Sequence, residues 1–371
     1  MLRWLKRVVK AVLLVVALVV AIPVLGLAYG FLTTDAPAGA PIVAATPERA
    51  AVHDALAREI QGYQRPEEST YLTYPEWAIV YAAREYAGFV DDNNPSGFPY
   101  FAYVGRFWQD YAAMIRASSP YPFNFQNHLM LMVIGISHTV EHVIQSVYEN
   151  TVGRITGLFE DNAPEDIFLA AVAADYAAFL DQTPWYRFDY AVRRGEMWAL
   201  EPADGAGAVR SWERKLGFGL ALSIKQAYAD LITSGLAATS DPAALDIHVW
   251  AEGPVAEAIA GEADTSLERD LGEDGAVFVT KRYQVFTDMI PRLIERELRF
   301  VEIGGNDEIL LTVLSNEEPG LPDGARRIFS YTLPTDPAVV RTGISVAVAR
   351  LHEILPELQN ADARLEHVYD Y

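Results

Sequence analysis

The stretch from 11 to 32, "AVLLVVALVVAIPVLGLAYGFL", constrains the fold more than any other part of the chain because none of its 22 residues is charged. At 1.5 Å of rise per residue, a helix of this length spans the hydrocarbon core of a bilayer, which is about 30 Å thick. Pro23 kinks such a helix without forbidding it. A soluble fold would have to bury this segment, and no comparably apolar segment is present elsewhere in the sequence to cover it. The sequence therefore predicts one N-terminal transmembrane helix over residues 11–32.

The charges before this segment predict its orientation. The first ten residues carry four basic side chains and no acid: Arg3, Lys6, Arg7 and Lys10. The positive-inside rule places this tail, residues 1–10, in the cytoplasm and the body on the other side. We therefore expect an anchor in the bacterial inner membrane and a periplasmic body. A cleaved signal peptide is the alternative, since the small residues "DAPAGAP" follow, but the apolar region of a signal peptide is typically only about 7–15 residues long.

Composition excludes several classes of function. The chain has no cysteine, so disulfides, zinc–thiolate sites, iron–sulfur clusters and thiol nucleophiles are excluded. The formal net charge is −21 although the first ten residues are basic. Such an acidic body repels a phosphate backbone, so we expect no nucleic-acid partner. The predicted lipid contact is through residues 11–32.

The remainder divides into a helical part and a mixed part. After a proline-containing tether over 33–45, Thr46 and Pro47 provide a helix N-cap and first turn. Helical patterns then recur over 46–63, 74–90, 100–117, 125–159, 164–180 and 211–235. These segments predict an all-α domain over 46–240. An acidic linker is expected over 241–275.

The C-terminal part, 276–371, is predicted to be a ferredoxin-like α+β sandwich. Strands are expected over 276–283, 299–303, 308–314, 326–334 and 363–371, with helices over 286–298 and 339–359. The turn from Gly304 to Asp307 predicts a hairpin between two of the strands. This order, with one extra hairpin strand, resembles the β-α-β-β-α-β arrangement. We recognise no internal repeat.

The stretch "HTVEH", residues 138–142, carries the candidate site residues. On a helical wheel the apolar side chains fall on one side: Ile136, Val140, Val143 and Val147. The polar side chains fall on the other: His138, Glu141, His142, Gln145 and Glu149. His138 and His142 are spaced to bind one metal ion such as zinc, with Glu141 as a catalytic base toward a bound water. The alternative is an ordinary polar helix face, solvated or hydrogen-bonded in a groove.

The letters H-x-x-E-H at His138, Glu141 and His142 resemble the motif of the inverted zinc peptidases. That resemblance implies a metal-dependent hydrolase, with a third ligand from a later helix. Other strings, "YLTYPEW", "YPFNFQNHLMLMVIG", "YENTVGRITG", "WYRFDY" and "SWERKLGF", resemble a group of uncharacterised bacterial membrane-anchored envelope proteins. This second likeness covers about 70–235 and implies an envelope location without an activity.

Two further clusters have open interpretations. The aromatic stretch "FPYFAYVGRFWQDY", residues 98–111, is either core or the lining of a pocket for a lipidic or flat aromatic ligand. The basic residues between 187 and 215, among them Arg210, Arg214 and Lys215, either meet anionic headgroups or pair locally with acids such as Glu213.

Three functions remain open from the sequence, so whether the chain is an enzyme is undecided. The first is a membrane-anchored periplasmic accessory or scaffold protein of an integral membrane complex. The second is a metal-dependent hydrolase that uses His138, Glu141 and His142. The third is a protein that binds a lipidic or flat aromatic ligand in its helical domain.

Overall fold

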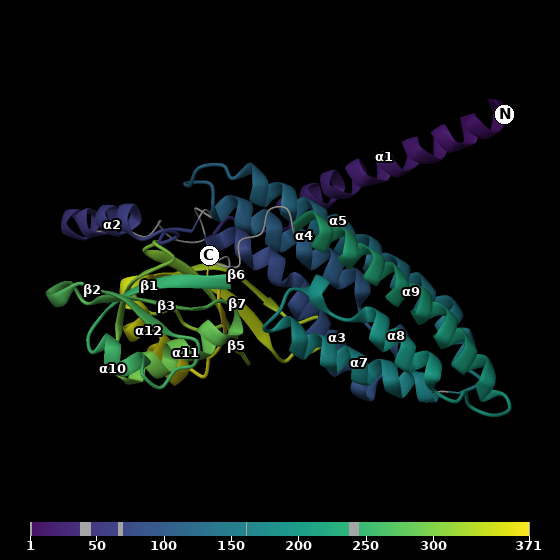
Figure 1. The fold of residues 1–371 in the computed structure, drawn as a ribbon. Coiled ribbons are helices and arrows are strands. Elements are labelled where there is room, and N and C mark those ends of the chain that lie inside the picture. Colours follow the sequence, from purple (N-terminus) through teal and green to yellow (C-terminus); the bar gives the residue numbers. More distant parts are fainter. Residues whose placement is uncertain (1, 38–45, 66–69, 161, 237–244, 371) are drawn as a thin grey trace.

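The computed structural model describes residues 2–37, 46–65, 70–160, 162–236 and 245–370. A helical half and a sheet half lie side by side, and the N-terminal helix projects away from both (Figure 1). The prediction of a helical unit followed by an antiparallel α+β region is confirmed in this coarse form.

The first helix, α1 (Leu2–Thr33), is continuous through the predicted span and contains Pro23. Its last turns are built into the body. Ile22 and Leu27 pack beside Trp108 in a common apolar cluster, and Arg116 donates hydrogen bonds to the carbonyl oxygens of Phe31 (2.7 Å) and Thr34 (2.9 Å). The predicted tether can therefore begin only after this docked end. Its residues 38–45 lie outside the described part of the chain.

The helical half matches most of the predicted segments. Its elements are η1 (Thr70–Trp77), α3 (Ala78–Asp92), η2 (Pro95–Gly97), α4 (Tyr100–Ala117), α5 (Phe125–Tyr148), the π-helix η3 (Glu149–Gly153), α6 (Arg154–Thr156), α7 (Pro164–Leu180), η4 (Trp185–Arg187), α8 (Tyr190–Ala199) and α9 (Gly207–Leu236). The helix expected over 125–159 is thus interrupted by a π-helical turn. Helix α8 was not predicted.

The sheet half differs from the predicted single sandwich because it contains two four-stranded sheets. Sheet A has the strand order β2-β3-β1-β4 and sheet B the order β6-β7-β5-β8, and neighbouring strands in both sheets are antiparallel. Sheet A contains β1 (Asp246–Glu252), β2 (Ser266–Asp270), β3 (Ala276–Lys281) and β4 (Arg299–Ile303). Sheet B contains β5 (Glu308–Ser315), β6 (Ala325–Thr332), β7 (Val340–Ala347) and β8 (Arg364–Val368).

The helices and short turns of this half connect the strands. They are α10 (Val255–Ile259), η6 (Gly272–Asp274), α11 (Gln284–Glu295), η7 (Val348–Arg350) and α12 (Leu351–Asn360). Apolar side chains of both sheets, α11 and α12 form one common core. Helix α2 (Pro47–Glu59) covers the other face of sheet A, while η1, α3 and α4 cover the other face of sheet B.

The two sheets are structurally equivalent. Both have their second, third, first and fourth strands in that spatial order, and the ladder between first and fourth strands shifts register after Trp250 in one sheet and after Thr312 in the other. The segments "DMIPRLIERELRFVEI" (288–303) and "EILPELQNADARLEHV" (353–368) lead into the fourth strands in the same way. Both have a proline in the helix and a positive φ two residues before the strand, at Glu297 (67°) and Asp362 (56°). The two sheets thus repeat one strand order and one helix-to-strand connection, which the sequence analysis did not recognise.

Three local predictions need correction. The helix expected over 339–359 is wrong at its start, because 340–347 forms the central strand β7 and only α12 is helical. The described part of the expected linker 241–275 holds β1, α10 and β2 of sheet A. The turn after Gly304 is present, but β4 and β5 diverge into different sheets after one isolated bridge between Ile303 and Asn306.

Candidate functional site

Helix α5 packs its polar side, not its apolar side, against the body, which excludes the solvated alternative for His138. The histidine side of the wheel points inward: His138 is 5% exposed and Glu149 is fully buried. The valine side points outward: Val140 is 40% and Val147 57% exposed. The exposed apolar side chains of α5 and its continuation are Phe125, Leu129, Met130, Val133, Val140, Ile144, Val147, Val152 and Ile155. The wheel separates the two faces correctly, but a wheel cannot say which face meets the body.

Helix α9 is inverted in the same way. Its exposed side chains from Val209 to Ala227 are all apolar, and they include Val209, Trp212, Leu216, Leu220 and Ile224. Its basic side chains Arg210, Arg214 and Lys215 are buried. The two helices lie antiparallel, because Glu141 of α5 pairs with Lys225 (2.6 Å) and Tyr148 further along α5 hydrogen-bonds to Glu213 earlier in α9. We call the exposed apolar side chains named for these two helices the outer face.

Buried charges form the inner side of the same helices. Arg214 makes two hydrogen bonds to Glu149 (2.7 and 3.0 Å) and one to Asp166 (2.7 Å). Arg210 donates hydrogen bonds to both oxygens of Asp166 and to one oxygen of Glu213, and Lys215 lies 3.4 Å from Glu165. These three cations are thus paired with acids, as one interpretation expected, but of the expected local partners only Glu213 takes part, and the other acids come from distant segments.

The predicted metal residues come together only in part. The imidazole rings of His138 and His142 have centroids 4.0 Å apart, and His142 Nδ1 lies 2.9 Å from the carbonyl oxygen of His138. Glu141 points away from them to Lys225. Within the described ranges, no group of three histidine, aspartate or glutamate side chains is placed to hold a metal ion. A metal site at His138 and His142, and a catalytic role for Glu141, stay predictions.

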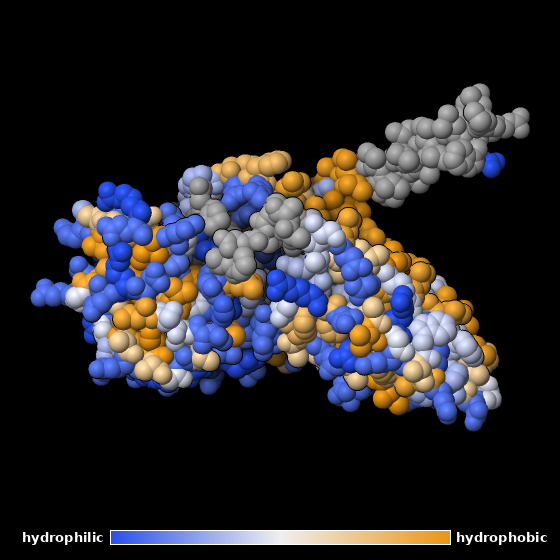
Figure 2. Space-filling view, viewed as in Figure 1, coloured by the Kyte–Doolittle hydropathy of each residue, from blue (hydrophilic) through white to orange (hydrophobic). Residues whose placement is uncertain are grey.

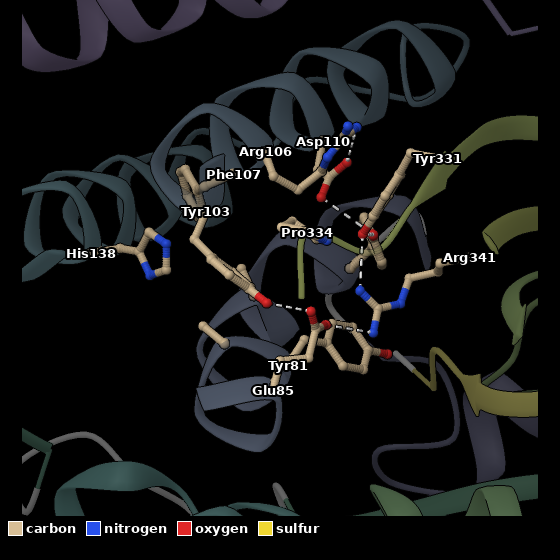
Figure 3. A pocket seen from close by; sticks show the side chains of 13 residues that line it. Tyr81, Glu85, Tyr103, Arg106, Phe107, Asp110, His138, Tyr331, Pro334 and Arg341 are labelled. Carbon is tan, nitrogen blue, oxygen red and sulfur yellow. Dashed lines mark hydrogen bonds and ion pairs between the residues drawn. The ribbon is translucent and has the colours of Figure 1, made fainter. Parts of the chain in front are cut away.

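His138 lines a small cavity where the helical half meets sheet B (Figure 3). The cavity measures about 20 Å³, which is enough for one water molecule but too small for a substrate. Its walls come from η1, α3, α4 and α5 on one side and from β6, β7 and their connection on the other. They are Tyr74, Ala78, Tyr81, Ala82, Glu85, Tyr103, Arg106, Phe107, Asp110, His138, Tyr331, Pro334 and Arg341.

Arg341 is the centre of the polar network around this cavity. It is 4% exposed and binds both oxygens of Glu366 (2.7 Å each), one oxygen of Glu85 (3.1 Å) and the hydroxyl of Tyr331 (3.1 Å). Tyr103 donates a hydrogen bond to Glu85, and burial raises the pKa of Tyr103 far above its ordinary range. One guanidinium on β7 thus connects α3 of the helical half to β8 of sheet B.

Asp110 is the carboxyl group of this cavity whose ion pair is long. It is 4% exposed, lies 3.7 Å from Arg106 and accepts a long hydrogen bond from Tyr74 (3.3 Å). Arg106 instead stacks over the ring of Tyr331, 3.7 Å from its centroid. Burial raises the pKa of Asp110 from 3.8 to about 7, and the nearby guanidinium groups offset only part of that effect.

We expect Asp110→Asn to abolish a pH dependence of stability. Because the folded protein keeps the Asp110 proton up to about pH 7 and the unfolded chain loses it near pH 4, wild-type stability falls as the pH rises through this window. The variant should match the wild type at pH 4 and be more stable at pH 8, by at most about 4 kcal/mol at 1.36 kcal/mol per pKa unit. Unfolding curves from pH 4 to 8 measure this difference. Parallel pH profiles for wild type and variant would contradict it, and Asp175→Asn on the exposed side of α7 is the control.

The sequence singles out His138 and the stretch 98–111, which both line the cavity, but it does not identify Glu85 or Arg341. Glu85 and Arg341 are 256 positions apart, so no local spacing connects them. The available signal is a charged residue inside an otherwise apolar segment, as Arg341 is in "VVRTGISVAVA" and Asp110 in "FWQDYAAM". The aromatic stretch 98–111 mainly contributes to packed clusters and to this cavity wall.

In comparisons with known proteins, no family model, curated protein or solved structure matches the chain.

Proposed function

We propose that this chain is a membrane-anchored accessory or scaffold protein of the bacterial envelope. In this proposal α1 spans the inner membrane, the N-terminus is cytoplasmic, and the body lies in the periplasm beside an integral membrane complex. The observation that carries the proposal is the way in which the apolar helix α1 is built into the body.

The base of α1 packs against α4 through glycines. A Cβ atom at Gly26 would overlap the indole of Trp108, and one at Gly30 would overlap the backbone carbonyl of the same residue. Gly26 and Gly30 are four positions apart, the spacing of small residues that lets two helices approach closely. Arg116 then binds the carbonyl oxygens at the end of α1. A body fixed to its anchor keeps one orientation relative to the membrane, which suits a scaffold better than a freely tethered domain.

The sheet half supplies the surface for a partner in this proposal. We further propose that each of its halves is a ferredoxin-like unit, supported by the order second-third-first-fourth in both sheets, which is that of a β-α-β-β-α-β sandwich. The second unit departs from this pattern between β5 and β6, where no helix is present among residues 316–324. Two such units fused around one core give a rigid platform.

Membrane topology and partner recovery test the proposal. Because the chain has no cysteine, the variants Arg3→Cys and Glu357→Cys each carry a single thiol that can be labelled. In intact cells an impermeant maleimide admitted to the periplasm should label Glu357→Cys, and Arg3→Cys only after the inner membrane is opened. Crosslinking in the same membranes should recover a discrete larger complex. Equal labelling of both sites would contradict the topology, and a chain that stays monomeric under crosslinking would contradict the accessory role.

A further inference from the structure

The outer face of α5 and α9 has the wrong polarity for a surface that meets water. Its side chains are apolar and strongly exposed: Ile144 63%, Leu216 61% and Leu220 63%. The residues on the opposite sides of the same helices are buried ions, with Glu149 and Arg214 each fully covered. Soluble proteins rarely expose a contiguous apolar patch larger than a few hundred Å². Helices with charges inside and apolar side chains outside are expected where the surroundings are hydrocarbon.

The face is nearly free of charge. Among the exposed side chains of α5 from Leu129 to Val147, the charged one is Glu141, and it pairs with Lys225 of α9. On α9, every exposed side chain from Val209 to Ala227 is apolar. Among the described residues, Phe125–Thr156 is also the one helical stretch of 18 residues or more that is apolar enough to cross a membrane. In its apolar 18-residue segment, only 22% is buried.

The face is continuous with the proposed anchor. Leu27 of α1 packs in one cluster with Leu131 and Met132 of α5, so the last turns of α1 and the first turns of α5 lie together. On α1 the side chains that point away from this contact are also apolar and exposed, with Leu25 at 69% and Leu32 at 85%. Apolar surface runs from the base of α1 along the edge formed by α5 and α9 (Figure 2). If residues up to Leu32 lie in hydrocarbon, the adjacent end of the outer face lies at the same depth.

We propose that the outer face of α5 and α9 is a second membrane contact, embedded in the lipid of the bilayer that α1 spans. The occupant is acyl chain, not a second protein. Trp198 and Trp212, exposed at 42% and 50% with ring centroids 6.2 Å apart, mark where the face reaches the headgroups, since tryptophan concentrates at that level. Helices α7 and α8 carry partly exposed ion pairs, Arg193 with Asp175 and Glu196, and in this proposal those pairs face water. This inference rests on the proposed function, because the anchor sets the depth of the face.

Environment-sensitive labels on the full-length protein test the embedding. Single cysteines at Ile144 and Leu220 on the face, at Leu25 on α1 and at Leu267 on β2 are labelled with NBD and reconstituted in phosphatidylethanolamine–phosphatidylglycerol vesicles. Leu267 is the matched control, an apolar side chain 45% exposed on sheet A. The labels at Ile144 and Leu220 should show blue-shifted emission and quenching by doxyl lipids comparable to that at Leu25. The label at Leu267 should instead be quenched by aqueous iodide.

The outcomes separate the inference from the proposal beneath it. Lipid quenching at Leu25 with iodide quenching at Leu220 overturns the embedding and leaves the anchor standing; shielding of Leu220 only in native membranes would then assign the face to a partner protein. Iodide quenching at Leu25 as well contradicts both. As a second measurement, Leu220→Glu should reduce lipid quenching of the Ile144 label, whereas Leu267→Glu should not, and unchanged circular dichroism shows that both variants fold. Equal quenching in the two variants also overturns the inference.

Discussion

Gly30→Leu is expected to detach the base of α1 from the body. The added Cβ would overlap the carbonyl oxygen of Trp108 and lie 2.9 Å from the Cβ of Ala112, and backbone cannot yield as a flexible side chain does. Overpacking of an ordinary core costs about 1–3 kcal/mol. Here the alternative is separation of two helices, with loss of the contacts that Ile22 and Leu27 make beside Trp108. We therefore expect an effect at or above the top of that range.

Spin labels measure this detachment directly. Two nitroxides are placed on one chain, at Leu32→Cys and Glu357→Cys, and the distance between them is measured. The otherwise wild-type protein should give one narrow distance distribution. Gly30→Leu should give a broad distribution and a lower unfolding temperature. Gly88→Leu in α3 is the control, because a Cβ at Gly88 meets no atom within 4 Å. A distribution that stays narrow in Gly30→Leu would show that α1 is not held by glycine packing, and the proposed fixed orientation would lose its basis.

The sequence predicts the helices well because their signals are local. Helices α4 and α7 have the predicted bounds, and Thr46 caps α2 as expected, accepting a hydrogen bond from the backbone NH of Arg49. Strand β7 was missed because "VVRTGISVAVARLHEILPELQ" joins a strand to a helix without a turn residue, and its apolar positions fit either period. The second sheet was missed for a different reason. Which strands pair is decided by contacts between segments, and the turn after Gly304 gave the same signal that a true hairpin gives.

The candidate site was predicted in part for a similar reason. The spacing of His138 and His142 correctly places their rings together. The direction of that face depends on what surrounds the helix. The assumption behind the wheel, apolar inside and polar outside, holds for a helix between core and water. It fails for α5 and α9, where ions such as Arg214 are paired inside with acids from η3 and α7. No pattern in α9 alone identifies Glu149 or Asp166 as those partners.

Arg214→Met is expected to cause the larger loss of stability, because it leaves buried acids without their cation. Arg214 is fully buried and holds Glu149 by two hydrogen bonds and Asp166 by a third. Removing one partner of a buried ion pair typically costs about 3–5 kcal/mol, whereas replacing both partners by apolar groups of similar volume is often neutral. Glu149 also begins the π-helix η3, so an unpaired charge there should disturb the end of α5. In the variant Asp166 keeps its hydrogen bonds to Arg210, so Glu149 is the buried acid that loses its cation.

Unfolding in one detergent, followed for the wild type and three variants, separates the loss of this ion pair from a general effect of losing an arginine. Arg214→Met should lose about 3–5 kcal/mol, and adding Glu149→Met should restore most of it, since the double variant buries no unpaired charge. Arg193→Met, which breaks a half-exposed pair with Asp175 and Glu196, should change stability by about 1 kcal/mol or less. If Arg214→Met costs no more than Arg193→Met, the interior of the helical half is wetter than its burial indicates. Water inside would then solvate the ions, and the inverted polarity of α5 and α9 would lose its argument for lipid.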